Sequence, residues 1–294
     1  MTADTVFEAR RGAMTGLAYR MLGSRAEAED VVQDAWLRWR KVEAQTVREP
    51  GAFLNRVVTR LCLDRLKAAR ARREVYVGEW LPEPVLDAEA LAPDETDLDA
   101  ELSVAFLLTL ERLSPLERAA FLLHDVFDRP FSEVAAALDR SEAACRQLAA
   151  RARTHVRQDR PQGRLGARPD PEAERRLTEA FMTAALTGDA DGLKAILTQD
   201  VVMHADGGGV VSANLNPIFG VEKAIRLIEG VLRKFPPPEG VTPRLARVNG
   251  MPGIVLVHPD GTVHQTMALE IAGDRIAAVY TVRNPDKLAG LSLQ

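Results

Sequence analysis

The sequence contains few cysteines, few aromatic residues and no long apolar segment. Cys62 and Cys145 are the only cysteines among 294 residues, and each lies inside an apolar helical pattern. Two distant thiols without neighbouring metal-ligand side chains are most simply reduced core residues. We therefore expect no disulfide, no metal ion and no other cofactor.

Segments that would direct the chain to or across a membrane are also missing from the pattern. The first residues do not show the basic and then apolar order of a secretion signal. No stretch approaches the roughly 20 uncharged apolar residues that a membrane helix needs. We expect a cytoplasmic protein without a membrane partner.

The chain as a whole has little excess of charge, with a net value of −4. The distribution is uneven, however. Residues 1–73 hold 15 basic and 9 acidic residues, residues 74–101 hold 10 acidic and no basic ones, and residues 102–168 hold 11 basic and 8 acidic ones. Two basic blocks separated by an acidic segment favour a nucleic-acid partner in spite of the negative total.

Segments rich in proline and glycine divide the chain into domains. With 294 residues, 46% of them hydrophobic, two or three domains with their own cores are expected. Helical periodicity precedes the acidic segment and predicts three helices, at 6–21, 26–41 and 53–69. We place the domains and linkers at 1–75 (helical), 76–98 (acidic linker), 99–158 (helical), 159–170 (second linker) and 171–294 (C-terminal domain).

The last third of the chain changes from helices to strands. Helices are predicted at 171–187, 189–197 and 220–234. Alternating apolar residues predict strands at 201–204, 243–249, 253–258, 263–271 and 275–283. Residues 258–262 and 272–275 are typical hairpin turns between these strands. Helices followed by a mostly antiparallel sheet indicate an α+β fold.

A helix-turn-helix pattern follows the acidic segment. Ser114 and Glu117 form a capping box that opens the first helix. A second helix is predicted at 131–138, and after a short turn Ser141 can cap a third helix at 142–157. Two helices joined by a three-residue turn, the second of them basic, are typical of proteins that read the major groove of DNA.

The third helix of this pattern has an apolar face and an arginine face. At about 100° per residue, its apolar residues share one arc. The opposite arc holds Arg146, Arg153 and Arg157, and Gln147 and Arg151 lie on the flank. Because arginine pairs bidentately with guanine and glutamine with adenine, we predict DNA contacts by Arg146, Gln147, Arg151 and Arg153. The alternative is an arginine-rich surface that only faces water.

The second helix of the N-terminal block carries an acidic face with one apolar residue on it. Asp30, Gln33, Asp34 and Leu37 lie together opposite the core residues of that helix. A leucine on an acidic outer face indicates a protein-docking surface, although an ordinary solvated face is common as well.

The third helix of the N-terminal block carries a basic stripe. Arg60, Lys67 and Arg70 lie within about 40° of Arg56 on a helix. Such a stripe suits the phosphate backbone of a nucleic acid. Alone it could equally be a solvated face, but beside a helix-turn-helix we interpret it as a DNA contact.

These segments resemble the extracytoplasmic-function, or group IV, sigma factors of the sigma-70 family. Residues 28–37 are similar to the polymerase-docking helix of region 2, residues 52–66 to the segment that reads the −10 element, and residues 101–157 to region 4, which reads the −35 element. The resemblance implies two partners: promoter DNA, and core RNA polymerase bound through its β′ clamp helices and β flap.

The resemblance also assigns roles to the predicted surfaces. The acidic face of Asp30, Gln33, Asp34 and Leu37 would meet the clamp helices. The basic stripe would engage −10 DNA as it melts, and the third helix of the helix-turn-helix would lie in the −35 major groove. Many relatives place asparagine where this chain has Arg60, so the choice of base at −10 stays open.

Three further segments are similar to the SigJ-type subgroup of these sigma factors. They are Trp80, Leu81 and Pro82 in the linker, then Asp206, Gly207, Gly208 and Gly209, and finally Asn284, Pro285, Asp286, Lys287 and Leu288. In that subgroup the C-terminal domain is a SnoaL-like cone of curved antiparallel sheet packed on helices. It acts as a built-in regulator, so no separate anti-sigma factor is expected.

The expected architecture is therefore multi-domain. Two all-α sigma domains, a three-helix region 2 and a helix-turn-helix region 4, precede an α+β SnoaL-like domain. An apolar Trp-Leu-Pro cluster in an acidic linker needs a place to bury its indole, and consecutive glycines let another chain approach closely. We predict that the three segments contact one another and so set the spacing of the two DNA-reading domains.

Other interpretations of the C-terminal domain stay open. His204, Asp206, His258 and His264 can be imagined as acid–base groups, but neither a nucleophile nor a metal-ligand spacing accompanies them, so we do not predict an enzyme. A small-molecule ligand of this domain is not excluded. The alternative function is a helix-turn-helix regulator that works without polymerase and carries a ligand-sensing or enzymatic domain. The docking pattern at 28–37 favours the sigma factor.

Overall fold

The computed structural model describes residues 3–42, 47–73, 76–86, 102–159 and 170–291. These residues form two compact units. The first contains the helices before residue 74 and those of 106–159, and the second contains residues 76–86 and the C-terminal third. Across these described ranges, no helix has both the length and the apolar character that crossing a membrane requires.

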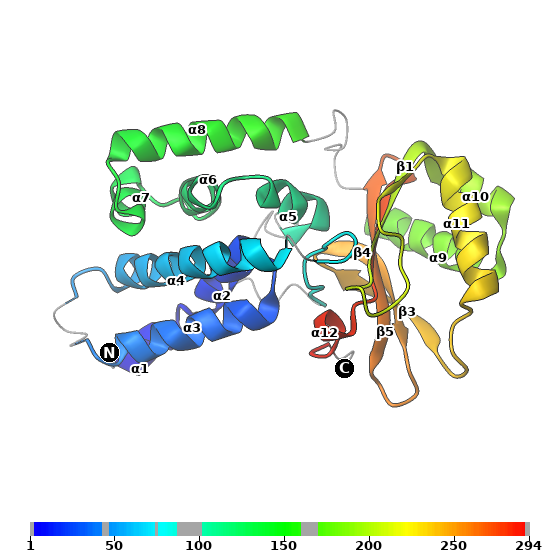
Figure 1. Cartoon of the computed structure of the whole chain (residues 1–294), viewed down its shortest axis with the longest axis horizontal. Helices are drawn as coiled ribbons and strands as arrows, with labels where there is room; N and C mark the ends of the chain where they lie inside the picture. The colour runs from blue at the N-terminus through cyan, green and yellow to red at the C-terminus, as the bar shows by residue number, and fades with distance from the viewer. Residues whose placement is uncertain (1–2, 43–46, 74–75, 87–101, 160–169, 292–294) are drawn as a thin grey trace. The chain divides into compact units, whose positions relative to one another are not determined.

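The described secondary structure in the N-terminal part of the first unit is helical (Figure 1). Its helices are α1 (Ala3–Glu8), α2 (Arg11–Leu22), α3 (Arg25–Trp39) and α4 (Pro50–Arg73). The single first helix that we predicted is wrong, because the backbone at Arg10 (φ −118°, ψ −3°) departs from helical angles between α1 and α2. Gly23 ends α2 with a left-handed φ of 68°, which glycine adopts without strain. Ser24 then caps α3 by accepting a hydrogen bond from the Glu27 N–H at 3.1 Å.

The second part of this unit contains the helix-turn-helix. Its segments are α5 (Val104–Glu111), α6 (Pro115–Phe121), the π-helical turn η4 (Leu122–Val126), α7 (Phe131–Leu138) and α8 (Glu142–Asp159). The predicted capping box of Ser114 and Glu117 is confirmed, and Ser141 caps α8 by accepting from the Ala144 N–H at 3.2 Å. The π-helical turn was not predicted, since period alone does not show where a helix widens.

The second unit is built on a six-stranded sheet. Its helices are α9 (Pro171–Thr187), α10 (Ala190–Ile196), α11 (Val221–Lys234) and α12 (Pro285–Leu288). Its strands are β1 (Leu197–Asp206), β2 (Ile218–Phe219), β3 (Thr242–Val248), β4 (Met251–Val257), β5 (Val263–Ala272) and β6 (Arg275–Val282), in the order β2-β1-β6-β5-β4-β3. The expected antiparallel sheet is wrong in one place, because β1 and β6 run parallel. Such a pair needs the long connection that α11 and β3–β5 provide.

Helices α9, α10 and α11 cover one face of this sheet (Figure 1). Phe181, Leu193 and Ile225, one from each helix, belong to the same buried core as Val201 of β1 and Leu269 of β5. Helix α12 and residues 76–86 lie on the other side of the strands. This arrangement is the α+β fold that the sequence predicts, with a mixed sheet in place of an antiparallel one.

Candidate functional site

Helix α8 presents an arginine surface opposite a buried face. The predicted core face is confirmed at Cys145, Leu148, Ala152 and Val156, which are buried together with Ala149, whereas Ala144 is half-buried. Arg146, Gln147, Arg151 and Arg157 are exposed, and Arg153 is half-buried. The helix therefore has the two-sided character of a recognition helix.

The arginines of α8 differ in their partners. Arg151 Nε donates to Glu117 Oε1 at 2.9 Å, and Arg153 Nε donates to Asp125 Oδ1 at 2.5 Å, so both fasten α8 to α6 and η4. Burial opposes ionisation of Glu117, but bonds from Ser114 and Arg151 outweigh it and lower the pKa of that carboxyl. Arg146 forms its ion pair within its own helix, with Glu142 at 3.0 Å, and its guanidinium lies 5.7 Å from the ring centroid of Phe131 in α7. The first turns of α8 therefore carry the part of its arginine surface that is not ion-paired to α6 or η4 among the described contacts.

The acidic face of α3 is present on the surface. Asp30 and Gln33 are exposed, Asp34 is half-buried and Leu37 is 51% exposed. Arg65 of α4 reaches this face, 3.4 Å from Asp30 Oδ2 and 3.2 Å from Asp34 Oδ2. The sequence stripe did not include Arg65, because its role depends on how α3 and α4 pack. The face is a partly charge-balanced acidic patch around one apolar side chain.

The basic stripe of α4 is less uniform than its helical angles predict. The Arg56 guanidinium lies 5.4 Å from the Phe53 ring centroid, and Lys67 pairs with Asp64 at 3.0 Å. Arg60 donates to the carbonyl oxygens at the end of α7, at 3.3 Å to that of residue 137 and 3.4 Å to that of residue 136. The side chain of Arg70 lies outside the described residues. Arg60 therefore ties the stripe to the helix-turn-helix in this structure.

Arg118 makes a second link between the two helical parts of this unit. Its buried guanidinium donates to the Met21 carbonyl at 2.5 Å and to Glu111 Oε1 at 2.7 Å. Burial lowers the pKa of Arg118 to about 10, which still leaves it charged at neutral pH. A buried arginine that bonds the Met21 carbonyl in the last turn of α2 holds the end of that helix against α6.

The three segments singled out in the second unit meet around one buried carboxylate, that of Asp206. Asp206 is 0% exposed. Its Oδ2 accepts from the Leu81 N–H at 2.8 Å and from Lys287 Nζ at 2.7 Å, and its Oδ1 accepts from the Tyr76 hydroxyl at 2.6 Å and the Gly208 N–H at 2.9 Å. We call this group of residues, 76–82, 206–209 and 284–288, the linker clasp.

Lys287 and Asn284 complete the linker clasp from the C-terminal side. The ammonium of Lys287 also donates to the Leu81 carbonyl and lies 4.3 Å from the centroid of the Trp80 ring. Asn284 Nδ2 donates to the Tyr76 hydroxyl at 2.9 Å. Burial and the bond to Asp206 raise the pKa of Tyr76, so the phenol stays protonated as a donor. Sequence reasoning missed Tyr76, whose importance depends on its position beside Asp206.

The remaining predicted residues of the linker clasp shape it. Leu81, Pro82 and Leu288 are buried. Pro285 and Asp286 form the start of α12, where the Asp286 N–H donates to Asn284 Oδ1 at 3.1 Å. The glycines allow close approach: a Cβ on Gly207 would lie 2.1 Å from the Val211 carbonyl, and one on Gly209 2.9 Å from Val77 Cβ. Side chains at these positions would push the segments apart.

The linker is held at a second point, beyond the clasp. Leu86 forms an isolated bridge with Val248. The Asn249 N–H donates to the Val85 carbonyl at 2.8 Å, and the Val85 N–H donates to Asn249 Oδ1 at 3.3 Å. Residues 76–86 are therefore an integral part of the C-terminal unit.

The three histidines named as candidate acid–base groups do not gather at one site. His204 Nδ1 lies 2.7 Å from Glu79 Oε1, and its ring stacks on Tyr280. His258 and His264 contact each other at 3.2 Å. In the part of the chain that the structure describes, no three His, Cys, Asp or Glu side chains gather to hold a metal ion.

Comparison with known proteins places these surfaces in a family. The sigma-70 region 2 family matches residues 6–72, and the sigma-70 region 4 family matches residues 103–156. Over 298 aligned residues the chain is 38% identical to the ECF RNA polymerase sigma factor SigJ of Mycobacterium tuberculosis, covering 98% of this chain and 94% of that relative. The chain belongs to the extracytoplasmic-function sigma factors.

The similarity extends over the whole sigma factor. This chain is 32% identical to the probable ECF sigma factor SigI of Mycobacterium tuberculosis, over an alignment that covers 97% of this chain and 94% of that relative. The crystal structure of Mycobacterium tuberculosis SigJ matches with a TM-score of 0.76 and 35% identity, covering 98% of this chain and 99% of that chain. Region 2 of this sigma factor is thus α1–α4, and region 4 is α5–α8. The C-terminal α+β domain belongs to the shared architecture.

Family membership predicts which residues on the arginine surface of α8 contribute most to recognition of the −35 element. With core polymerase bound, we expect Arg146→Ala and Gln147→Ala each to reduce the preference for a promoter with an intact −35 element by about 5- to 150-fold, the equivalent of ~1–3 kcal/mol per base contact. Arg153→Ala should leave this preference nearly unchanged, because its ion pair with Asp125 serves packing. Competition binding against a scrambled −35 element measures the ratio. Equal losses for Arg153 and Arg146 would contradict the assignment.

Gly208 offers a specific test of the linker clasp. A Cβ at Gly208 (φ +64°) would lie 2.4 Å from Asn284 Nδ2, whereas one at Gly273 (φ +65°) would meet no atom within 4 Å. Both Gly→Ala changes carry the same left-handed strain, so Gly208→Ala should cost about 1–3 kcal/mol more, through overpacking. Hydrogen exchange in residues 76–86 should increase for Gly208→Ala alone. Identical exchange in the two variants would show that the clasp tolerates a methyl group there.

Proposed function

We propose that this alternative sigma factor directs core RNA polymerase to promoters through regions 2 and 4, and that its C-terminal domain regulates it in cis by holding the linker between them. The observation that carries the second part is the buried Asp206 carboxylate, which binds the linker backbone at Leu81 and the C-terminal Lys287 at once. A charged pair this well buried is stable only while all of its partners stay in place.

The surfaces of the sigma domains support a division of roles. Asp30, Gln33 and Asp34 around Leu37 form the docking face for the β′ clamp helices, since an exposed leucine framed by polar groups is typical of an interface centre. The stripe of α4 is the −10 surface, and the first turns of α8 are the −35 surface. Region 4 would also meet the β flap, as the family resemblance implies.

The contact between regions 2 and 4 describes a state that is not bound to a whole promoter. Elements named −10 and −35 lie roughly 85 Å apart at about 3.4 Å per base pair. Domains of this size are far smaller than that separation, and Arg60 of region 2 touches α7 of region 4 directly. Binding both elements therefore requires the bonds of Arg60 and Arg118 across this contact to break.

Holding residues 76–86 changes how the two DNA-reading regions can separate. Residues 74–103 connect α4 to α5, and the C-terminal domain takes a continuous part of this connection out of free motion. Only the sequence between residue 86 and α5 then separates the held segment from region 4, so the C-terminal domain limits how far the two regions can move apart. We infer that the domain is a regulator without catalytic activity of its own, and that it serves in place of a separate anti-sigma factor.

Promoter-specific initiation tests the proposal. Purified full-length chain added to core polymerase should start transcripts at a defined promoter, and core polymerase alone should not. Trp80→Ala should change the interdomain distance measured by solution scattering, because the Trp80 ring is one of the groups that bind the Lys287 ammonium. Val210→Ala, which alters an exposed side chain next to the glycines, is the matched control. Initiation without the chain, or scattering profiles that coincide for wild type and Trp80→Ala, would overturn it.

A further inference from the structure

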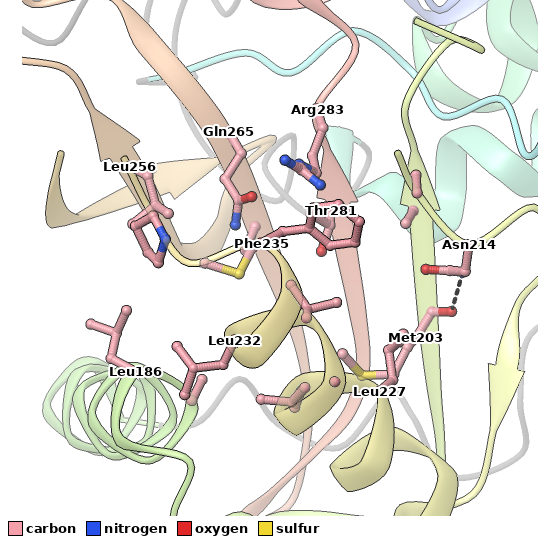
Figure 2. A pocket seen from close by; sticks show the side chains of 18 of the residues that line it. Leu186, Met203, Asn214, Leu227, Leu232, Phe235, Leu256, Gln265, Thr281 and Arg283 are labelled. Carbon is pink, nitrogen blue, oxygen red and sulfur yellow. Dashed lines mark hydrogen bonds between the residues drawn. The ribbon is translucent and has the colours of Figure 1, made fainter. Parts of the chain in front are cut away.

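The C-terminal domain encloses a cavity of about 580 Å³ between α9, α11 and the sheet (Figure 2). This volume lies within the range of about 300–1,000 Å³ typical of small-molecule sites. None of the linker clasp residues lines the cavity, and the proposed regulation of the sigma regions makes no use of it. Its lining can therefore be considered for what it would bind.

Most of the cavity wall is apolar. Helix α9 contributes Phe181 and Leu186, α11 contributes Leu227 and Leu232, and the sheet contributes side chains such as Met203. In Figure 2, Leu186, Leu227 and Leu232 lie toward one end of the cavity. The polar side chains of Arg283, Gln265 and Thr281 lie toward the other end, with Leu256 beside Gln265. An apolar body with a polar group at one end matches this division.

The charged residues around the cavity are all basic. None of the described residues that line it is acidic, whereas Arg226, Arg233, Lys234 and Arg283 are cationic. The first three are exposed on α11, and Arg283, at the end of β6, is half-buried. Burial lowers the pKa of His264 in the same wall, so that imidazole is neutral at pH 7 and Arg283 supplies the inner charge.

Arg283 has unused hydrogen-bonding capacity at this position. One of its terminal nitrogens, Nη1, donates to the Ser212 carbonyl at 2.7 Å. Its Nε is buried and has no hydrogen-bond partner among the described residues. A buried donor without a hydrogen-bond partner loses its bonds to water and gains no bond in exchange. A guanidinium that served packing alone would therefore be destabilising here. An anion at this end of the cavity would satisfy it in a fork geometry.

Gly230 is a second, independent indication that the cavity has a function. It lies within α11, where glycine weakens a helix relative to alanine. It lines the cavity, and a Cβ built on it meets no atom within 4 Å. A larger residue would favour the helix and would fit the protein, but it would take volume from the cavity.

We propose that this cavity binds an organic anion with an apolar body and a single carboxylate, whose oxygens pair with Arg283. The apolar body lies along α9 and α11. The amide of Gln265 and the hydroxyl of Thr281, from the paired strands β5 and β6, complete the polar end beside Arg283. This inference does not rest on the proposed cis regulation, and either can fail while the other stands.

Calorimetry on the full chain tests the proposal with defined probes. The panel is octanoate, dodecanoate, 1-naphthaleneacetate and deoxycholate, with dodecan-1-ol and dodecylamine as neutral and cationic counterparts of dodecanoate. We expect at least one carboxylate to bind, and dodecanoate to bind more tightly than the alcohol or the amine. Arg283→Met should weaken the best carboxylate by about 10- to 100-fold, the usual range for a charged hydrogen bond, and Arg233→Met, an exposed arginine of the same lining, by less than about threefold.

A cavity-filling variant guards against misfolding of Arg283→Met. Gly230→Leu should abolish binding of the carboxylate while leaving the melting temperature equal or higher, because it fills open space on a helix. Failure of all four carboxylates to bind the wild-type chain at millimolar concentration would overturn the proposal. So would equal affinity for dodecylamine and dodecanoate, or full binding by the Gly230→Leu variant.

Discussion

Replacing Asp206 by alanine is expected to destabilise the docked linker by about 3–5 kcal/mol, the usual cost of removing one partner of a buried ion pair. The change leaves Lys287, only 8% exposed at its side chain, without its counter-charge. It also leaves the Tyr76 hydroxyl and the Leu81 N–H without their acceptor. Hydrogen exchange in residues 76–86 should accelerate by about two to four orders of magnitude, at 1.4 kcal/mol per tenfold.

Two further variants separate charge from packing in this experiment. Asp200→Ala changes an exposed aspartate on the same strand, β1, and should leave exchange in residues 76–86 as it is. Adding Lys287→Met to Asp206→Ala should recover part of the loss, because no unpaired charge then stays buried. Unchanged exchange in Asp206→Ala would show that the linker is held mainly by Leu81, Val85 and Leu86, which are all buried.

Replacing Leu37 by arginine is expected to lower the affinity for core polymerase by about 30- to 1,000-fold, the range for loss of an interface hot spot of 2–4 kcal/mol. Leu37 is 51% exposed on α3, so the fold does not depend on its side chain. An arginine at the centre of the docking face would bury an unpaired charge against the clamp helices. Thermal unfolding should shift little, because exposed substitutions change stability by about 0.5 kcal/mol or less.

The control for Leu37→Arg introduces the same side chain at a different place on the surface. Leu245→Arg puts the same side chain on β3, where Leu245 is 38% exposed in the C-terminal domain. Binding of labelled chain to core polymerase, followed by fluorescence anisotropy, should be lost only for Leu37→Arg. Equal weakening by both variants would point to a general charge effect. No weakening by Leu37→Arg would remove α3 from the polymerase interface.

Local rules account for what the sequence predicted well. The capping serines at 114 and 141 and the apolar arc of α8 depend on residues a few positions apart, and all three are confirmed. The clasp segments were identified by their resemblance to the SigJ-type subgroup, and the composition of two of them, three glycines in a row and an indole in an acidic linker, indicated close packing. What such composition shows is that a segment must pack, and the structure supplies the partner.

Long-range packing accounts for what the sequence could not show. Arg65 on the acidic face, Arg60 at the end of α7 and Tyr76 on Asp206 all depend on elements that meet only after folding. The parallel pairing of β1 with β6 is of the same kind, since an alternating pattern is equal for parallel and antiparallel neighbours. The cavity could not be predicted from the sequence either. Its apolar lining residues have the pattern of ordinary core positions, and Arg283 has the pattern of a residue at the end of a strand.

Promoter spacing tests the control of the linker most directly. Single-round initiation is measured with core polymerase on promoters whose −35 and −10 elements are moved apart one base pair at a time, each step adding about 3.4 Å and about 34° of rotation. Wild type should show a narrow optimum, because residues 76–86 are held. Lys287→Met, which opens the clasp, should initiate over a wider range of spacings, and Lys223→Met, an exposed lysine of α11, should behave as wild type. Coinciding spacing profiles for wild type and Lys287→Met would contradict the account.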